Sequence, residues 1–400
     1  MSQALANVRV LDLSNVLAGP FCAYQLALLG AEVIKVEVPM TGDLARQLGA
    51  DAELNANYMG ASFLAQNSGK KSVTVNLKTA EGKAVLKRLV ATADVLVENF
   101  RPGVMARLGL DWDELKACNP QLVYCAISGF GQDGPLKDAP AYDQIIQGLS
   151  GMMSITGDER SAPLRVGSPV ADTISGITAA FAIASALVRR YRTGEGGFID
   201  VSMLESTLVT MGWVVSNYLI AGTEPRAWGN ENMTAAPSGA FKTGSGLLNI
   251  AANKQEQFEA LAREIGREDL IADPRFAKRE ARKRHRAELT TEIELALATQ
   301  DAAHWERVFN KIGIPAGRVL TVPQVLQSAQ IRHRELLQTF DAVPGVGRDI
   351  TVPRAGFRLS EGDPRSSLPP PLLGQHTDEI LQSIGLRADE IEQLRSEGAI

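Results

Sequence analysis

Short Val- and Ile-rich runs alternate with longer amphipathic stretches over the first two hundred residues, and this alternation constrains the fold most strongly. Strand-like runs occur at 8–14, 31–38, 71–77, 93–100, 121–128 and 196–204. Between them, apolar residues recur at helical spacing, as at 21–30 and 81–93. Strands that alternate with helices of this length predict βαβ units and a mainly parallel sheet, which is a Rossmann-like α/β fold. Ligands of such sheets bind beyond the carboxyl ends of the strands, which selects the loops 14–20, 38–46, 99–103 and 129–143 as candidate site segments.

The chain is predicted to contain two domains, because 400 residues exceed one ordinary core. The amino-acid composition changes near Gly222, where a polar segment rich in Pro and Gly precedes charged helical patterns. We therefore expect a large α/β domain at 1–224 and a small α+β domain at 225–325. Residues 326–400 are expected to return to the large domain.

Charge and composition argue against several classes of protein. A net charge of -5 does not favour nucleic-acid binding, and the four histidines lack the spacing of a metal site. Three cysteines are too few for a disulfide framework, which fits a reducing compartment. The first residues lack a signal-peptide pattern, and the most apolar segment, 174–188, is short for a membrane span. We therefore expect a cytoplasmic protein with no membrane partner.

Two other motifs were weighed for ligand binding. The loop after the first strand reads NVLAGPF, which lacks the glycines of a dinucleotide fingerprint, so NAD binding is disfavoured. The basic run KREARKRHR, 278–286, is interpreted as a solvated helix face, with a phosphate site as the alternative.

Two acids stand at predicted helix starts. Asp172, in VGSPVADTISG, precedes a Gly- and Ala-rich helix, and its pattern fits a helix N-cap as well as a catalytic carboxylate. Asp143 follows the glycine-rich loop GFGQDGP and is also a candidate cap. From the residues alone, both interpretations stay open.

Several phrases together resemble the class III CoA-transferases, the CaiB/BaiF family that includes formyl-CoA transferase. They are VRVLDLSNVLAGPF, LLGAEVIKVEVPMTGDLAR, NSGKKSVTVNLKTAEGK, ADVLVENFRPGVMARLGLDW, YCAISGFGQDGP, YDQIIQGLSGMMSITG, VGSPVADTISG, GGFIDVSMLES, GIPAGRV and PPPLLGQHTDEIL. The resemblance implies transfer of coenzyme A from an acyl-CoA donor to a carboxylic acid, with Asp172 as the nucleophile that forms an aspartyl-CoA thioester. It implies CoA thioesters as substrates, no permanently bound cofactor and an interlocked homodimer.

The resemblance also assigns residues around the substrates. The CoA site would use Leu17, Ala18, Asn76, Leu77, Lys78, Asn99, Phe100 and Arg107. Asp143 would lie beside the reacting acyl group, with Tyr142 on the substrate side. We expect Arg46 or Arg165 to pair with a distal carboxylate, which favours dicarboxylic acids and succinyl-CoA as the donor. A surface salt bridge is the alternative for Arg165.

Two rival functions remain. An α-methylacyl-CoA racemase would need a histidine where this chain has Tyr142, and a non-catalytic CoA-binding protein would need no acid at position 172. The chain also lacks the glycine loop that shields the intermediate in formyl-CoA transferase, and this disfavours formate or oxalate as the acid. The segment 237–246 is the candidate replacement for that loop.

Overall fold

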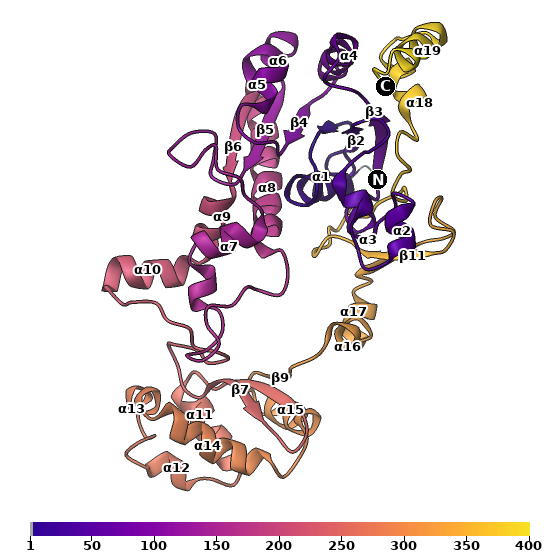
Figure 1. Ribbon diagram of the computed structural model, residues 1–400. Coiled ribbons are helices and arrows are strands. Elements are labelled where there is room, and N and C mark those ends of the chain that lie inside the picture. Colours follow the sequence, from indigo (N-terminus) through magenta and orange to yellow (C-terminus); the bar gives the residue numbers. More distant parts are fainter. Residues whose placement is uncertain (1–2) are drawn as a thin grey trace. The chain divides into compact units, whose positions relative to one another are not determined.

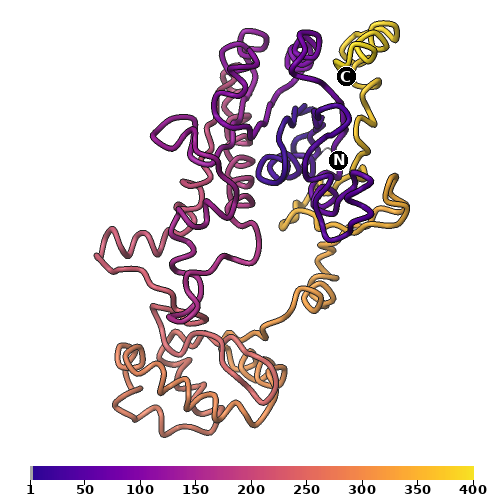
Figure 2. The backbone as a smooth tube through the Cα atoms, viewed as in Figure 1, coloured from indigo at the N-terminus to yellow at the C-terminus, as the bar shows by residue number. Residues whose placement is uncertain are grey.

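The computed structural model describes residues 3–400, which divide into two compact units. The first unit comprises Met1–Met152, Arg165–Thr223 and Arg332–Ile400, and the second comprises Met153–Leu164 and Glu224–Ile331. Figure 2 shows that the chain enters the second unit twice. The predicted domain boundaries include 153–164 in the first domain. That placement is wrong, because the Gly229 amide donates to the Gly157 carbonyl at 2.6 Å and joins this segment to the second unit.

The first unit is built on a six-stranded sheet in which all neighbouring strands are parallel, as predicted. In chain order the strands are β1 (Arg9–Asp12), β2 (Glu32–Glu37), β3 (Lys70–Thr74), β4 (Val95–Glu98), β5 (Val123–Ser128) and β6 (Gly197–Ser202). Their order in the sheet is β3-β2-β1-β4-β5-β6. The direction of winding therefore reverses between β1 and β4, and such a switch point opens a crevice at the carboxyl ends of the two strands.

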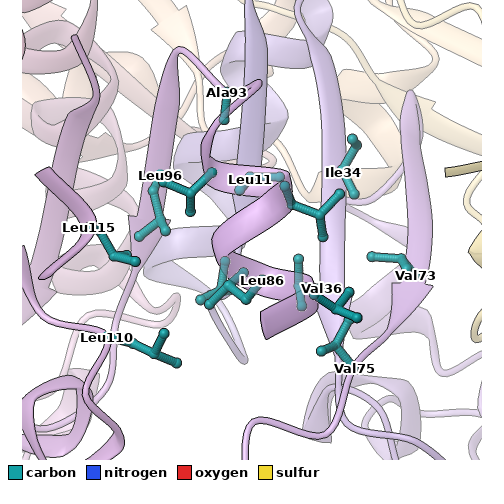
Figure 3. Close-up of a cluster of buried hydrophobic side chains, with 14 of the residues drawn as sticks. Leu11, Ile34, Val36, Val73, Val75, Leu86, Ala93, Leu96, Leu110 and Leu115 are labelled. Carbon is teal, nitrogen blue, oxygen red and sulfur yellow. The ribbon is translucent and has the colours of Figure 1, made fainter. Parts of the chain in front are cut away.

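Alternating side chains of each strand supply two cores, one on each face of the sheet. Val10 lies in the core that includes α1 (Ala18–Leu28) and α8 (Val170–Thr193), whereas Leu11 lies in the opposite core. Figure 3 shows that opposite core, where Leu11, Ile34 and Leu96 of the sheet meet Leu86 of α4 (Ala80–Val90). Burial on both faces explains the nearly continuous apolar runs in the sequence.

Helix α8 packs closely against α1 because its inner face is made of small residues. A Cβ atom on Gly176 would lie 2.7 Å from the Ala18 carbonyl oxygen, so the contact needs glycine. By length and composition alone, α8 is the one described helix that is apolar enough to cross a membrane. Core helices of soluble proteins pass the same test, and Ala171, Ala179 and Ile183 of α8 are buried in this unit.

The end of the chain packs against the edge of the sheet at β3. Helices α18 (Thr377–Ser383) and α19 (Ala388–Ser396), drawn in yellow in Figure 1, lie beside the early strands. The imidazole Nδ1 of His376 accepts a hydrogen bond from the Ser72 backbone amide at 3.2 Å. The Asn76 backbone amide donates to the Ala399 carbonyl at 2.8 Å.

The other short elements belong to the first unit, except α16 in the second unit and η2 and α17, which cross the boundary between the units. They are η1 (Leu44–Gln47), α2 (Ala52–Ala56), α3 (Ala61–Leu64), α5 (Val104–Leu108), α6 (Trp112–Cys118), α7 (Asp143–Leu149), η2 (Met152–Ile155), α9 (Met203–Thr210), α10 (Gly212–Ala221), α16 (Val322–Leu326), α17 (Ala329–His333), β10 (Leu337–Phe340) and β11 (Ile350–Pro353).

The second unit is a three-stranded antiparallel sheet packed with helices. Its strands are β7 (Ser238–Lys242), β8 (Leu247–Ala251) and β9 (Ala316–Arg318), and its helices include α11 (Gln255–Glu264), α12 (Asp269–Ala272), α13 (Arg279–Arg284), α14 (Arg286–Leu297) and α15 (Ala302–Lys311). The segment 237–246, a candidate shielding loop in the sequence analysis, is therefore mostly strand β7 and its turn. Residues 238–242 are paired with β8, and the role of the segment as a shielding loop stays a prediction.

The basic run 278–286 is predicted to form a solvated helix face, and this is true of only part of it. Lys278, Arg279 and Arg284 are exposed, whereas Arg282 and Arg286 are buried. Arg282 is fully buried, and its Nε donates to the Ala236 carbonyl at 2.8 Å. Arg279 and Arg286 likewise donate to the carbonyls of Thr234 and Ala235, at 2.9 and 3.0 Å. Three guanidinium groups thus bind three consecutive carbonyls. Two of these carbonyls belong to the buried residues Ala235 and Ala236, and buried backbone acceptors need donors.

Candidate active site

A cavity of about 270 Å³ opens at the switch point of the sheet, beyond the carboxyl ends of β1, β4 and β5. Six of the predicted site residues line it: Leu17, Ala18, Asn99, Phe100, Tyr142 and Asp172. The remaining lining residues are Asn15, Val16, Arg101, Pro102, Ile127, Ser128, Gly129, Lys137, Ala139, Ala141 and Met203. The strand order therefore brings together segments that lie far apart in the sequence.

The loop after β1 forms one wall of the cavity and is held in an unusual conformation. Val16 has a φ of 68°, which is left-handed and costly for a β-branched residue. Its amide donates to Asp43 Oδ1 at 2.9 Å, and its carbonyl accepts from Gln66 Nε2 at 2.6 Å. The side chain of Asn99, which follows β4, accepts a hydrogen bond from the Asn15 backbone amide and donates one to the Asn15 backbone carbonyl. These contacts fix the loop before any ligand binds.

Buried charges lie beneath this loop. Lys70 Nζ is 2.8 Å from Asp12 Oδ2, and Lys35 Nζ is 2.9 Å from Asp43 Oδ2, all within fully buried side chains. Burial alone would raise the pKa of Asp12, but Lys35 and Lys70 outweigh it and lower that pKa to about 2. Burial lowers the pKa of Lys70 to about 8. Removing any one of these four side chains would leave an unpaired buried charge, which is costly. The ion pairs therefore keep the Asp43 carboxylate in place to accept the Val16 amide.

Helix α8 is capped by a residue from another helix. Its N-cap position is Pro169, which has no side-chain acceptor, and Asp172 lies three residues further on. Asp143 Oδ1 accepts the amide hydrogens of Ala171 and Asp172, at 2.8 and 3.3 Å. The interpretation of Asp172 as the N-cap is therefore wrong. Asp143 does act as a cap, but it caps α8 and not α7, the helix to which it belongs. The Asp172 carboxylate is left free of capping.

The carboxyl group of Asp172 has an unusual proton affinity. It is half-buried at the cavity wall, and burial together with the nearby Asp143 carboxylate raises its pKa to about 7. A more basic carboxylate is a stronger nucleophile, while enough of it stays ionised at neutral pH to react. The amides of Ala171 and Asp172 are already bound to Asp143, so they do not serve as donors to an acyl oxyanion.

The structure places other predicted residues away from the cavity. Arg46 is fully buried and donates to both carboxylate oxygens of Glu37, at 2.7 and 2.8 Å, so its proposed pairing with substrate is wrong. Arg165 is exposed, and its Nε donates to the neighbouring Val166 carbonyl at 3.3 Å. Neither arginine lines the cavity.

The remaining predicted CoA residues lie along the same edge of the sheet but outside the cavity lining. Asn76, Leu77 and Lys78 follow β3, and Lys78 is exposed there. Arg107 is exposed on α5, which follows β4. Sequence reasoning missed Arg101 and Lys137 as cavity cations, although both fall in loops selected by the strand-end rule.

No histidine among residues 3–400 lines the cavity. Tyr142 lines the same cavity as Asp172 and occupies the position where a racemase would need a proton-accepting imidazole. The described lining therefore does not contain the histidine that the racemase alternative requires at position 142.

Known proteins resemble this chain over most of its length. The profile of CoA-transferase family III matches residues 5–377. The chain belongs to that family. A succinyl-CoA:glutarate CoA-transferase of Mus musculus is 39% identical over 398 residues, which cover 99% of this chain and 90% of that relative. An acetyl-CoA:oxalate CoA-transferase of Acetobacter aceti is 40% identical over 344 residues, with 86% and 87% covered.

Solved structures of the family share the fold. A CaiB/BaiF family protein from Brucella suis superposes with a TM-score of 0.83 at 35% identity, and 96% of this chain and 100% of that chain are covered. This family III CoA-transferase therefore has the α/β architecture that the resemblance implied.

Proposed function

We propose that this family III CoA-transferase moves coenzyme A from succinyl-CoA to a dicarboxylic acid through a thioester on Asp172. The observation that carries the proposal is the free Asp172 carboxylate at the wall of the switch-point cavity, with its pKa raised to about 7. The capping bonds of Asp143 keep the helix start in place without using the Asp172 side chain.

The reaction divides one exchange into balanced steps. A carboxylate oxygen of Asp172 attacks the thioester carbonyl, the C–S bond breaks, and an aspartyl anhydride and the CoA thiolate form. The thiolate then attacks the aspartyl carbonyl, the anhydride C–O bond breaks, and succinate leaves with that electron pair. The acceptor acid reverses these steps on the aspartyl-CoA thioester. Water must be excluded, because it would hydrolyse the anhydride.

The dicarboxylate specificity is supported by relatives and by one cation. The relatives described above are named for glutarate and oxalate, which are both dicarboxylic acids. The oxalate enzyme also weighs against our expectation that oxalate is disfavoured. Lys137 lines the cavity from the 129–143 loop that carries Tyr142, and its ammonium has no ion pair within the described residues. We assign the distal carboxylate to Lys137 in place of Arg46 and Arg165.

A second copy of the chain is proposed as the partner. Helices α8, α9 and α10 of the first unit expose large apolar side chains, including Phe181 at 73%, Trp213 at 83% and Ile220 at 86%. Apolar surface of this extent is typical of an interface between subunits. We propose an interlocked homodimer, as in the family that the sequence resembles. All three cysteines are free, which supports a cytoplasmic location.

Intact-mass analysis tests the nucleophile. Protein mixed with succinyl-CoA is expected to gain the mass of CoA less water, and peptide mapping should locate the adduct at Asp172. The Asp172→Ala variant should show no adduct and no turnover. An adduct on another residue, or turnover by the variant, would refute the mechanism.

A further inference from the structure

One buried side chain joins the three segments that meet at Asp172. Gln147 lies one turn after Asp143 on α7 and is fully buried. Its Nε2 donates to Asp143 Oδ2 at 2.7 Å, while Asp143 Oδ1 caps the helix that begins next to Asp172. The two carboxylate oxygens of Asp143 are therefore divided between Gln147 and α8.

The Gln147 side chain also binds the segment that leads into α8. Gln147 Oε1 accepts the Val166 amide at 2.9 Å, and Nε2 lies 3.3 Å from the Ser168 carbonyl. Val166 and Ser168 belong to the segment that leads into α8, and Ser168 and Pro169 are exposed. Without these bonds the segment would be anchored mainly through the helix itself.

We propose that Gln147 is a positioning residue for Asp172, which acts by orienting the Asp143 carboxylate and the 166–168 segment. Its amide has a donor and an acceptor, and the site uses both, so neither an apolar side chain nor a carboxylate of the same size can replace it. The proposal rests on the function proposed above. It adds that the geometry of the nucleophile depends on a residue that does not line the cavity.

The position of a nucleophile affects the chemical step more than substrate binding. A displacement of about 1 Å can cost roughly a hundredfold in rate. Gln147→Met keeps the length of the side chain and removes both hydrogen-bonding functions. We expect its kcat to fall about 10- to 100-fold, with the KM for succinyl-CoA within about threefold of the wild-type value.

A second variant separates positioning from packing. In Gln147→Glu, an ionised carboxylate would face Asp143 Oδ2 and repel it, whereas the protonated acid would donate as the amide does. We therefore expect the kcat of Gln147→Glu, relative to wild type, to recover as the pH falls from 8 to 6. A side chain that only fills space would show no such dependence on pH.

The test uses the full chain and a matched control on the same helix. Gln144 is exposed on α7, so Gln144→Met introduces the same change without touching Asp143, and its kcat should equal that of wild type. Circular dichroism and thermal melting verify folding of each variant. A folded Gln147→Met with a kcat within twofold of wild type would overturn the proposal, as would a loss in Gln147→Glu that is the same at every pH. Wild-type protein without turnover would instead refute the proposed function, so the two failures are distinguishable.

Discussion

The side-chain amide of Asn99 makes two hydrogen bonds with the backbone of Asn15, one in each direction. Its Oδ1 accepts the Asn15 amide at 2.8 Å, and its Nδ2 donates to the Asn15 carbonyl at 2.8 Å. The pair joins the loops that follow β1 and β4, the two strands of the switch point. Asn99 therefore shapes the cavity wall through the backbone of the opposite loop.

Asn99→Leu is expected to weaken acyl-CoA binding. Leucine has a similar size but neither donates nor accepts, so two backbone groups of Asn15 lose their partners at a cost of about 1–3 kcal/mol. We predict a roughly 10-fold higher Kd for CoA, measured by calorimetry. Asn57→Leu, at an exposed position on the described surface, is the control and should bind as wild type. An unchanged Kd in folded Asn99→Leu would show that the two loops do not need this link.

Asp143→Asn should move the acid limb of the rate profile to lower pH. Burial, together with the charge of Asp143, raises the pKa of Asp172 to about 7. Asparagine keeps an oxygen for the amides of α8 but removes the charge, so the pKa of Asp172 should fall and its carboxylate should stay ionised in more acidic solution. The asparagine Nδ2 would face the Gln147 Nε2 donor, so kcat should fall as well. We predict that the acid limb of kcat/KM moves to lower pH. Asp138→Asn, on the exposed part of the same loop, should leave the profile in place, and an unshifted Asp143→Asn profile would argue against the charge effect.

Lys137→Met tests which part of the substrate the ammonium binds. Loss of one charge-assisted contact of about 1.5–3 kcal/mol predicts a 10- to 100-fold fall in kcat/KM with succinyl-CoA. Activity with butyryl-CoA, which lacks the distal carboxylate, should change less than about threefold. Equal losses with both thioesters would place Lys137 on the CoA phosphates instead. Lys116→Met, on the exposed side of α6, is the control.

Glu98 makes stability depend on pH. Burial raises the pKa of Glu98 to about 7, although the Phe100 amide and the Tyr124 hydroxyl bind its carboxylate. Because the pKa of Glu98 is higher in the folded state, the protonated carboxyl group favours folding. This contribution to the free energy of unfolding is complete below pH 4.5, the ordinary pKa of the group, and is lost as the pH rises through about 7. Glu98→Gln should remove this loss and stabilise the protein at pH 8 by about 2 kcal/mol. Thermal melting between pH 5 and 8 measures it, and parallel curves for variant and wild type would contradict it.

Trp213→Glu should prevent pairing of two chains. The indole is 83% exposed on the apolar face formed by α8, α9 and α10, and a carboxylate there would be desolvated without a partner. Light scattering after size exclusion should show a dimer for wild type and a monomer for the variant. Leu295→Glu, at an exposed apolar position of the second unit, should remain dimeric. A monomeric wild-type protein would contradict the homodimer.

Much of the large domain could be predicted because its signals are local. Runs such as 31–38 and 121–128 are apolar since both faces of the sheet are buried, and each became a parallel strand. The buried charges could not be predicted. Arg46 looked like a substrate cation because no local pattern shows that Glu37 lies 2.7 Å away inside the protein. Burial of a charge depends on partners from other strands, and a single sequence does not show those pairings.

The sequence by itself determined the alternation of strands and helices and the loops that carry the site, and the family resemblance predicted Asp172 as the nucleophile. The tertiary structure decided what surrounds that residue. It showed that Asp143 caps α8, that Gln147 holds Asp143, and that Lys137 lines the cavity in place of Arg46. The physical reason is that secondary structure follows from the spacing of neighbouring side chains. The proton affinity and orientation of a carboxylate follow instead from groups that are distant in the chain and are brought within hydrogen-bonding distance only by folding.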